Sequence, residues 1–160
     1  MIQTIDTIDY KEIKDYYLSI EESLVWNEIS QQGKQSNIQY IQDEDPWTSG
    51  KRKDMRDPLI CCVLNPFFIN SVIEKLVIKF NLVRTRFMWL NSVSCYTMHK
   101  DTSPRIHIPI ITNPRCYFLF KDEAPVHLEE GKVYWTDTRK EHTAMNCSFN
   151  NRLHIVGAVK

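Results

Sequence analysis

The chain has 160 residues, enough for one domain with a sizeable hydrophobic core, whereas two independent cores would be crowded. Its 20 Lys and Arg residues balance its 20 Asp and Glu residues, so it lacks the basic excess typical of a dedicated nucleic-acid binder. No window approaches the ~20 apolar residues that span a bilayer, and the N-terminus shows no apolar signal segment. We therefore expect one soluble, cytoplasmic domain over residues 1–160, with no nucleic-acid or membrane partner.

Two helices are expected in the N-terminal half, residues 1–82. Residues 8–25 place apolar residues at roughly helical spacing between charged ones, which predicts a short amphipathic helix. The segment 66–81 opens with a proline, which suits the first turn of a helix, and continues with apolar residues at helical spacing. We expect this half of the chain to buttress the C-terminal half.

The chain between these helices is polar and rich in turn residues. The sequence therefore predicts loops over residues 27–58, with one short strand near residues 37–42. The charge run at 50–58 could contact an anion, but a solvated loop explains its composition more simply. The apolar run 58–66 predicts a buried strand that ends at its Asn-Pro pair.

The character of the sequence changes at about Val83. From there onward the chain consists of short runs of β-branched and aromatic residues, separated by turn residues. Seven or eight short strands at this spacing predict a sandwich or barrel rather than alternating β/α units. We therefore expect a mainly β protein with a barrel or jelly roll in its C-terminal half and N-terminal helices packed on it.

A histidine and an aspartate in the stretch 96–110 are suited to holding a metal ion. Alternate side chains of an extended strand share a face, so His99 and Asp101 point the same way. A third ligand must come from a distant strand, and the candidates are His107, His127, His142 and His154. His142 suits the role because it lies where one strand ends in a turn and another begins. Two histidines and a carboxylate form the triad of non-haem Fe(II) oxygenases, although an H-x-D pair also occurs in polar turns.

Arg152 is a second feature that indicates a site. It opens an otherwise apolar strand ten residues after His142, and no Asp or Glu follows His142 in the chain. A guanidinium inside a barrel is costly unless it meets an anion, and its planar fork fits a carboxylate; the alternative is a packed stem with the charged head in water. Arg105 and His107 also share one strand face, although a lone histidine can equally be a hydrogen-bonded core residue.

Four further cations could meet a substrate's carboxylate or backbone. They are Arg84, Arg86, Lys100 and Arg115. Charged residues are mostly exposed in folded proteins, so each of the four is more simply explained as a solvated surface charge.

In this order, the motifs resemble the aspartyl/asparaginyl β-hydroxylase-like family of Fe(II)- and 2-oxoglutarate-dependent dioxygenases. The resemblance covers about residues 83–159 and rests on these segments: HKD at 99–101, RIH at 105–107, EEG at 129–131, D-x-x-x-x-H at 137–142 and the arginine at 152. It implies a cupin-like double-stranded β-helix, a form of jelly roll, with the catalytic core in residues 83–160.

The resemblance also implies roles for the matched residues. His99, Asp101 and His142 would hold the catalytic iron. The residues expected at 2-oxoglutarate are Arg152 at its distal carboxylate and Arg105 and His107 at its other end. Ligating imidazoles usually donate their second N–H to an acceptor, and the candidates for that acceptor are Asp137, Asn146 or a backbone carbonyl.

The implied activity is hydroxylation of a protein or peptide side chain, or of a free amino acid, with O2 as cosubstrate and release of succinate and CO2. Two other functions fit part of the pattern. A cupin-like metal enzyme that does not use 2-oxoglutarate would keep the triad but has no need for Arg152. A non-catalytic cupin-like binding module would keep the barrel but would not be expected to retain every ligand.

Overall fold

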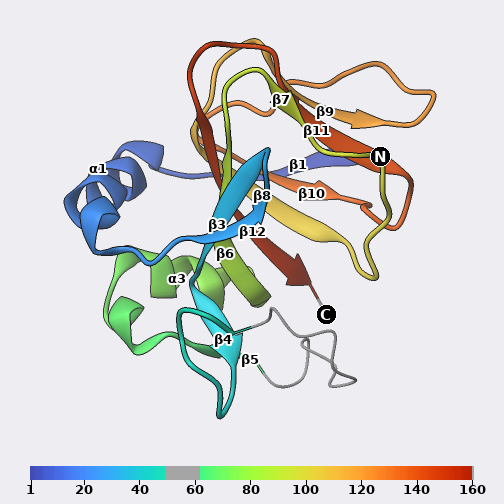
Figure 1. The fold of residues 1–160 in the computed structure, drawn as a ribbon. Coiled ribbons are helices and arrows are strands. Elements are labelled where there is room, and N and C mark those ends of the chain that lie inside the picture. Colours follow the sequence, from blue (N-terminus) through green and yellow to red (C-terminus); the bar gives the residue numbers. More distant parts are fainter. Residues whose placement is uncertain (50–61, 160) are drawn as a thin grey trace.

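Figure 1 shows the computed structural model, which describes residues 1–49 and 62–159. Within these residues the strands form a larger and a smaller antiparallel sheet that face each other. The larger sheet consists, in spatial order, of β1 (Ile2–Thr7), β10 (Lys132–Thr136), β8 (Arg105–Ile111), β12 (Arg152–Val159), β6 (Leu82–Leu90), β3 (Gly33–Asn37) and β2 (Asn27–Ser30). The smaller sheet consists of β7 (Ser94–Cys95), β11 (His142–Asn146) and β9 (Cys116–Phe120). The prediction of a mainly β jelly roll with N-terminal helices is confirmed.

Helices cover the outer face of the larger sheet. The predicted first helix is present as α1 (Tyr10–Ile20), capped by Asp9 and followed by a short 3-10 turn, η1 (Glu21–Ser23). The predicted second helix is divided into η2 (Pro66–Phe68) and α3 (Val72–Lys79). The division arises because Asn70 has a positive φ of 62° and the Ser71 hydroxyl caps a new helix by accepting from the Glu74 N–H. Among the described helices, none is long and apolar enough to cross a membrane.

Alternation along the central strands separates a hydrophobic core from the space between the sheets. Side chains such as Phe87, Ile108 and Ile155 are almost fully buried in the cluster that also contains residues of α1 and α3. Their neighbours in sequence, including Arg86 and His107, line a cavity between the two sheets. The period-two pattern of these strands therefore places polar groups on one face and the core on the other.

The N-terminal half contributes more strands than its composition predicts. The expected strand near residues 37–42 is present as β4 (Gln39–Ile41). The sequence did not predict β1, β2 or β3. The sequence of β3, GKQSN, has no apolar alternation because its buried side chains are polar; its two amides are hydrogen-bonded, as when Asn37 Nδ2 donates to the Ser49 carbonyl at 3.0 Å. Pairing with β6, rather than apolar burial, holds β3 in the sheet.

The predicted strand at 58–66 is described only in part, as β5 (Cys62–Leu64), which pairs with β4. It is half-buried rather than buried, because it belongs to a two-stranded ribbon outside the two large sheets. The charge run at 50–58 lies outside the described residues.

A β-bulge interrupts β6 beside the cavity. Two residues, Arg84 and Thr85, lie opposite the single Gly157 of β12. Arg84 has a left-handed φ of 54°, which is uncommon for a residue with a side chain. A Cβ at position 157 would lie 2.9 Å from Thr85 Oγ1, so the close approach of the bulge requires glycine there.

The side chain of Gln39 holds this bulge. Its Oε1 accepts from the N–H of Thr85 at 3.0 Å and from the Thr85 hydroxyl at 2.7 Å, and its Nε2 donates to the Leu82 carbonyl at 3.1 Å. We expect Gln39→Ala to lower the free energy of unfolding by about 3 kcal/mol, because it leaves buried groups on β6 without partners. Urea unfolding measures this, with exposed Gln42→Ala as the control, expected to change stability by less than about 0.5 kcal/mol. Equal effects of the two substitutions would contradict the assigned role of Gln39.

Candidate metal centre

His99, Asp101 and His142 come together at the cavity between the sheets. One ligand atom from each lies within 4.8 Å of the others, and the centroids of the two imidazole rings are 4.4 Å apart. Asp101 Oδ2 lies 4.0 Å from His142 Nε2. In the part of the chain that the structure describes, this is the one cluster of three such groups at metal-binding distance.

The backbone around the cluster is irregular rather than a continuous strand. His99 forms an isolated antiparallel bridge with His142, through paired backbone hydrogen bonds of 3.0 and 2.9 Å. Asp101 follows in a coil, where its N–H donates to the Thr138 carbonyl at 2.8 Å. The expectation that His99 and Asp101 share one strand is therefore wrong. Their common orientation comes from pairing with the segment that leads into β11.

Both imidazoles have one ring nitrogen occupied by a backbone carbonyl. His99 Nδ1 lies 2.8 Å from the Thr97 carbonyl oxygen, and His142 Nδ1 lies 2.9 Å from the Lys140 carbonyl oxygen. A carbonyl only accepts, so these contacts assign the proton to Nδ1 and leave the Nε2 lone pair for a metal. Burial lowers the pKa of His142, which favours the neutral form that a metal ligand needs.

Asp137 and Asn146, the two side chains predicted as acceptors for these imidazoles, bond elsewhere. The Asp137 carboxylate pairs with Arg139 Nε at 2.7 Å, which lowers the pKa of Asp137. Asn146 Nδ2 donates to the carbonyls of Asn91 at 3.0 Å and Asn150 at 2.7 Å. Of the three acceptors that the sequence left open, backbone carbonyls are therefore the ones that contact the histidines, whereas the Asp137 carboxylate and the Asn146 amide each stabilise a turn at a strand end.

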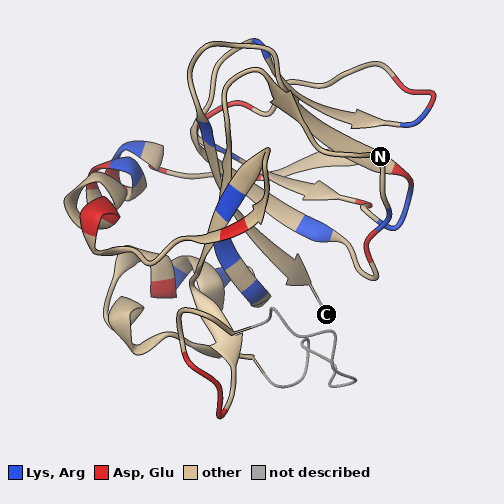
Figure 2. Cartoon of the chain, in the orientation of Figure 1, with Lys and Arg blue, Asp and Glu red and all other residues tan. Residues whose placement is uncertain are grey.

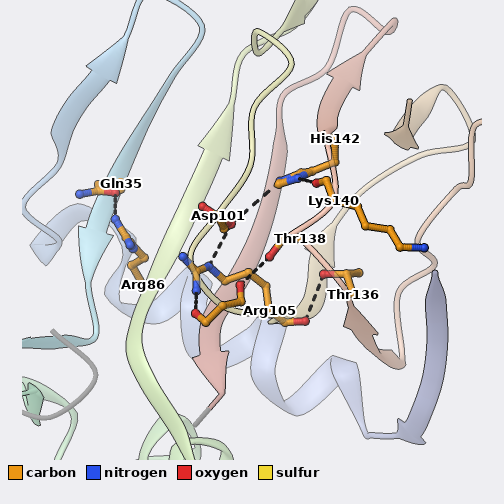
Figure 3. Close-up of polar contacts among 9 residues, drawn as sticks. Gln35, Arg86, Asp101, Arg105, Thr136, Thr138, Lys140 and His142 are labelled. Carbon is orange, nitrogen blue, oxygen red and sulfur yellow. Dashed lines mark hydrogen bonds and ion pairs between the residues drawn. The ribbon is translucent and has the colours of Figure 1, made fainter. Parts of the chain in front are cut away.

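Asp101 is also bound by an arginine (Figure 3). Arg105 Nε lies 3.2 Å from Asp101 Oδ2, and Arg105 Nη1 donates to the Ser103 hydroxyl. The Thr138 hydroxyl donates to the Ser103 carbonyl at 2.7 Å, which ties this turn to the segment before β11. Arg105 is buried, and its guanidinium neutralises and orients the Asp101 carboxylate.

Deeper in the cavity lie two buried groups with unused hydrogen-bonding atoms. Arg152 is 3% exposed, and its Nε has no hydrogen-bond partner. His107 is 6% exposed, and neither of its ring nitrogens has a partner. Burial, reinforced by the nearby Arg152 charge, holds the pKa of His107 well below its usual value, so its imidazole is neutral. Buried polar atoms are nearly always paired, so this part of the cavity is suited to an anionic ligand.

The remaining candidate histidines lie away from the cluster. His127 is half-buried, and its Nδ1 contacts the Cys116 carbonyl oxygen at 2.9 Å. His154 is 1% exposed and packs against the His107 ring at a centroid distance of 5.9 Å. Of the four candidates for a third ligand, His142 alone completes the cluster among the described residues.

Two of the four further cations line the cavity, contrary to the expectation of a solvated surface. Arg84 and Arg86 lie in the wall of this cavity, which has a volume of about 280 Å³ and also reaches the three clustered residues. Arg86 Nη1 donates to Gln35 Oε1 at 2.6 Å, and burial together with the charges of Arg84 and Arg105 lowers the pKa of Arg86 to about 9. The period-two spacing R-T-R on a strand was the signal for a shared face. Lys100 and Arg115 are exposed, as expected.

Solved structures with the same fold perform different reactions. The chain is similar to a 2OG-Fe(II) oxygenase family oxidoreductase from Burkholderia pseudomallei, with 13% identity, a TM-score of 0.58, and coverage of 91% of this chain and 76% of the other. It is similar to the DMSP lyase DddQ from Ruegeria pomeroyi DSS-3, with 11% identity, a TM-score of 0.56, and coverage of 98% and 66%. It is also similar to a viral collagen prolyl hydroxylase from Paramecium bursaria Chlorella virus-1, solved with 2OG, with 12% identity, a TM-score of 0.55, and coverage of 99% and 96%. At such identities these likenesses show the fold alone.

The family is shown by sequence. No curated protein matches the chain significantly. The sequence model of the Aspartyl/Asparaginyl beta-hydroxylase family matches residues 9–160, which is nearly the whole chain. The chain therefore belongs to the aspartyl/asparaginyl β-hydroxylase family and is an enzyme of the hydroxylase class.

Proposed function

We propose that the protein is an Fe(II)- and 2-oxoglutarate-dependent dioxygenase. It would hydroxylate a protein or peptide side chain, or a free amino acid, with O2 as cosubstrate and release of succinate and CO2. The observation that carries this proposal is the position of the His99–Asp101–His142 cluster in one cavity with the unpaired, buried Arg152. The cluster provides donor atoms for a metal ion, and the buried guanidinium favours an anionic cosubstrate.

The donor set fits Fe(II). Two neutral imidazole nitrogens and one carboxylate oxygen are the donors of the facial triad in non-haem Fe(II) oxygenases. His99 Nε2, His142 Nε2 and the Asp101 carboxylate would hold the ion, with Nδ1 of each histidine fixed by a backbone carbonyl. Arg105 holds the Asp101 carboxylate in place. The bound iron supplies the redox chemistry that activates O2, which these side chains cannot supply.

The inner cavity fits 2-oxoglutarate. Arg152 would bind its distal carboxylate, because a buried guanidinium with a free Nε–H gains most from a carboxylate partner. The neutral His107 can donate one further N–H from the same side of the sheet. Apolar side chains in the wall, including Phe118 and Val156, exclude water from the bound cosubstrate.

The two other functions account for fewer of these structural observations. A cupin-like metal enzyme without 2-oxoglutarate would leave the buried Arg152 without an anion. A binding module would have no use for three metal donors at ligating distance with both histidine tautomers set. The likeness to the DMSP lyase concerns the fold and adds no observation in favour of that chemistry.

Anaerobic reconstitution tests the proposal. Protein with Fe(II) and 2-oxoglutarate is expected to show a weak metal-to-ligand charge-transfer absorption band, since the cosubstrate would bind the iron directly. On admission of O2 without substrate, it is expected to form succinate slowly. Absorption spectroscopy and chromatographic assay of succinate measure the two outcomes. The absence of both would refute the dioxygenase.

A further inference from the structure

The cavity carries an excess of positive charge. Four guanidinium groups line it, from Arg84, Arg86, Arg105 and Arg152, and among its described lining residues Asp101 is the one acid. The strands that form this wall, β8, β12, β6 and β3, contain no Asp or Glu. Figure 2, with Lys and Arg in blue and Asp and Glu in red, shows blue and no red on β6 and β8. Burying several like charges is unfavourable unless anions accompany them.

The proposed iron and cosubstrate do not remove this excess. The double positive charge of Fe(II) balances the double negative charge of 2-oxoglutarate. Asp101 is engaged by Arg105, and Arg152 lies at the inner position that suits the cosubstrate. Within residues 1–49 and 62–159, Arg84 and Arg86 form no salt bridge, and the hydrogen bond from Arg86 goes to the neutral amide of Gln35.

The fold holds this arginine pair in a set position. Arg84 occupies the β-bulge with its left-handed φ of 54°, and Arg86 follows at the end of the bulge. Gln39 stabilises the bulge through three hydrogen bonds. Bulges and uncommon backbone conformations often occur where a side chain is directed at a ligand. Here both guanidinium groups reach the cavity that contains the metal cluster.

A second hollow adjoins the cavity at His99. It has a volume of about 270 Å³ and shares Ile29, Met88, Tyr96 and His99 with the cavity. Its described lining contains no Lys, Arg, Asp or Glu. His99 thus borders both a cationic compartment and an uncharged one.

We propose that Arg84 and Arg86 form the substrate's anion-binding subsite, and that the substrate is a carboxylate whose uncharged part lies in the hollow lined by Ile29, Met88 and Tyr96. The proposal rests on the proposed function, because the reacting carbon must face the metal centre, whose His99 borders both compartments. A carboxylate matches the paired guanidinium forks and offsets their charge.

Matched acid and amide probes test the subsite. Three N-acetylated pairs differ in one group: N-acetyl-leucine and its amide for a main-chain carboxylate, N-acetyl-aspartic amide and N-acetyl-asparagine amide for a side-chain carboxylate, and N-acetyl-phosphoserine amide and N-acetyl-serine amide for a phosphate. Isothermal titration calorimetry measures the binding of each to anaerobic protein loaded with Fe(II) and 2-oxoglutarate. At least one carboxylate is expected to bind about tenfold or more tightly than its amide.

The variants are Arg84→Gln and Arg86→Gln, with Arg115→Gln as the matched control on an exposed arginine. Each cavity variant is expected to remove the acid preference and to leave the dissociation constant of 2-oxoglutarate within about twofold, whereas the control keeps both. Arg84→Glu is expected to invert the preference towards the amide. If Arg86→Gln does not fold, as judged by circular dichroism, the Arg84→Glu variant still tests the subsite.

Each outcome separates the subsite from the proposed function. Loss of the acid preference in the Arg84 and Arg86 variants alone supports the subsite, and the preferred pair tells main-chain from side-chain carboxylates. No acid preference in wild-type protein, a preference that survives Arg84→Glu, or a preference for phosphate alone would overturn it. A wild-type protein with neither the charge-transfer band nor succinate formation would instead refute the proposed function, while calorimetry, which uses neither readout, still reports on the subsite.

Discussion

His142→Ala is expected to abolish iron retention and with it the turnover of 2-oxoglutarate. His142 is 4% exposed and stacks on Phe118 with ring centroids 5.3 Å apart, so no other side chain can readily take its place. Losing one of three protein donors should weaken iron binding by more than the about 10- to 100-fold typical of removing a group that merely supports a ligand. Iron content after desalting and succinate formation measure the two effects.

The matched control for this variant is His127→Ala. His127 is a half-buried histidine whose Nδ1 also contacts a backbone carbonyl, but it lies outside the cluster. It should retain wild-type iron content and succinate formation. Stoichiometric iron together with full turnover in His142→Ala would remove this residue from the proposed metal centre.

Arg152→Met is expected to weaken 2-oxoglutarate binding by about 100-fold or more while iron stays bound. Methionine fills much of the space of the arginine stem and leaves no charge, so the effect isolates the guanidinium. Removing a buried cation that lacks a full set of partners should leave the ligand-free protein as stable as wild type, or more so. Titration of the charge-transfer band measures the affinity, and thermal unfolding measures the stability.

Arg115→Met serves as the control, because Arg115 is exposed and outside the cavity. It should bind 2-oxoglutarate as wild type does. In wild-type protein, 2-oxoglutarate should raise the unfolding midpoint, and in Arg152→Met this rise should vanish at the same ligand concentration. Equal loss of iron and 2-oxoglutarate would show that Arg152 acts on the metal centre rather than on the cosubstrate.

The fold could be predicted from sequence wherever burial imposes a period on the residues. The strands β6 and β8 alternate core residues such as Phe87 and Ile106 with cavity residues, and the spacing of such short β-branched and aromatic runs between turn residues predicted the barrel. The strand β3 could not be predicted, because its buried side chains are two amides and a hydroxyl, and its place in the sheet depends on backbone pairing with β6. Its polarity resembles that of a loop, and only the neighbouring strand makes it a strand.

Spacing predicted which residues of the site meet, but not how they are paired. The motif H-x-D and the distant His142 do converge, yet through a backbone bridge rather than along one strand. Arg105, expected at the cosubstrate, pairs with Asp101. Such pairings form only between side chains that the turns between strands bring to within about 3 Å of each other. The local sequence does not show which side chains these are.

The sequence by itself predicted the class of fold, the three proposed metal donors and the buried arginine at the start of β12, because these predictions rest on residue types and on their spacing along the chain. Tertiary structure alone decided which acceptors orient the histidines and that β2 and β3 complete the sheet. It also decided that Arg84 and Arg86 face the metal centre rather than solvent. The physical reason is that hydrogen bonds and charge pairing act over a few ångströms, between segments that are far apart in the chain.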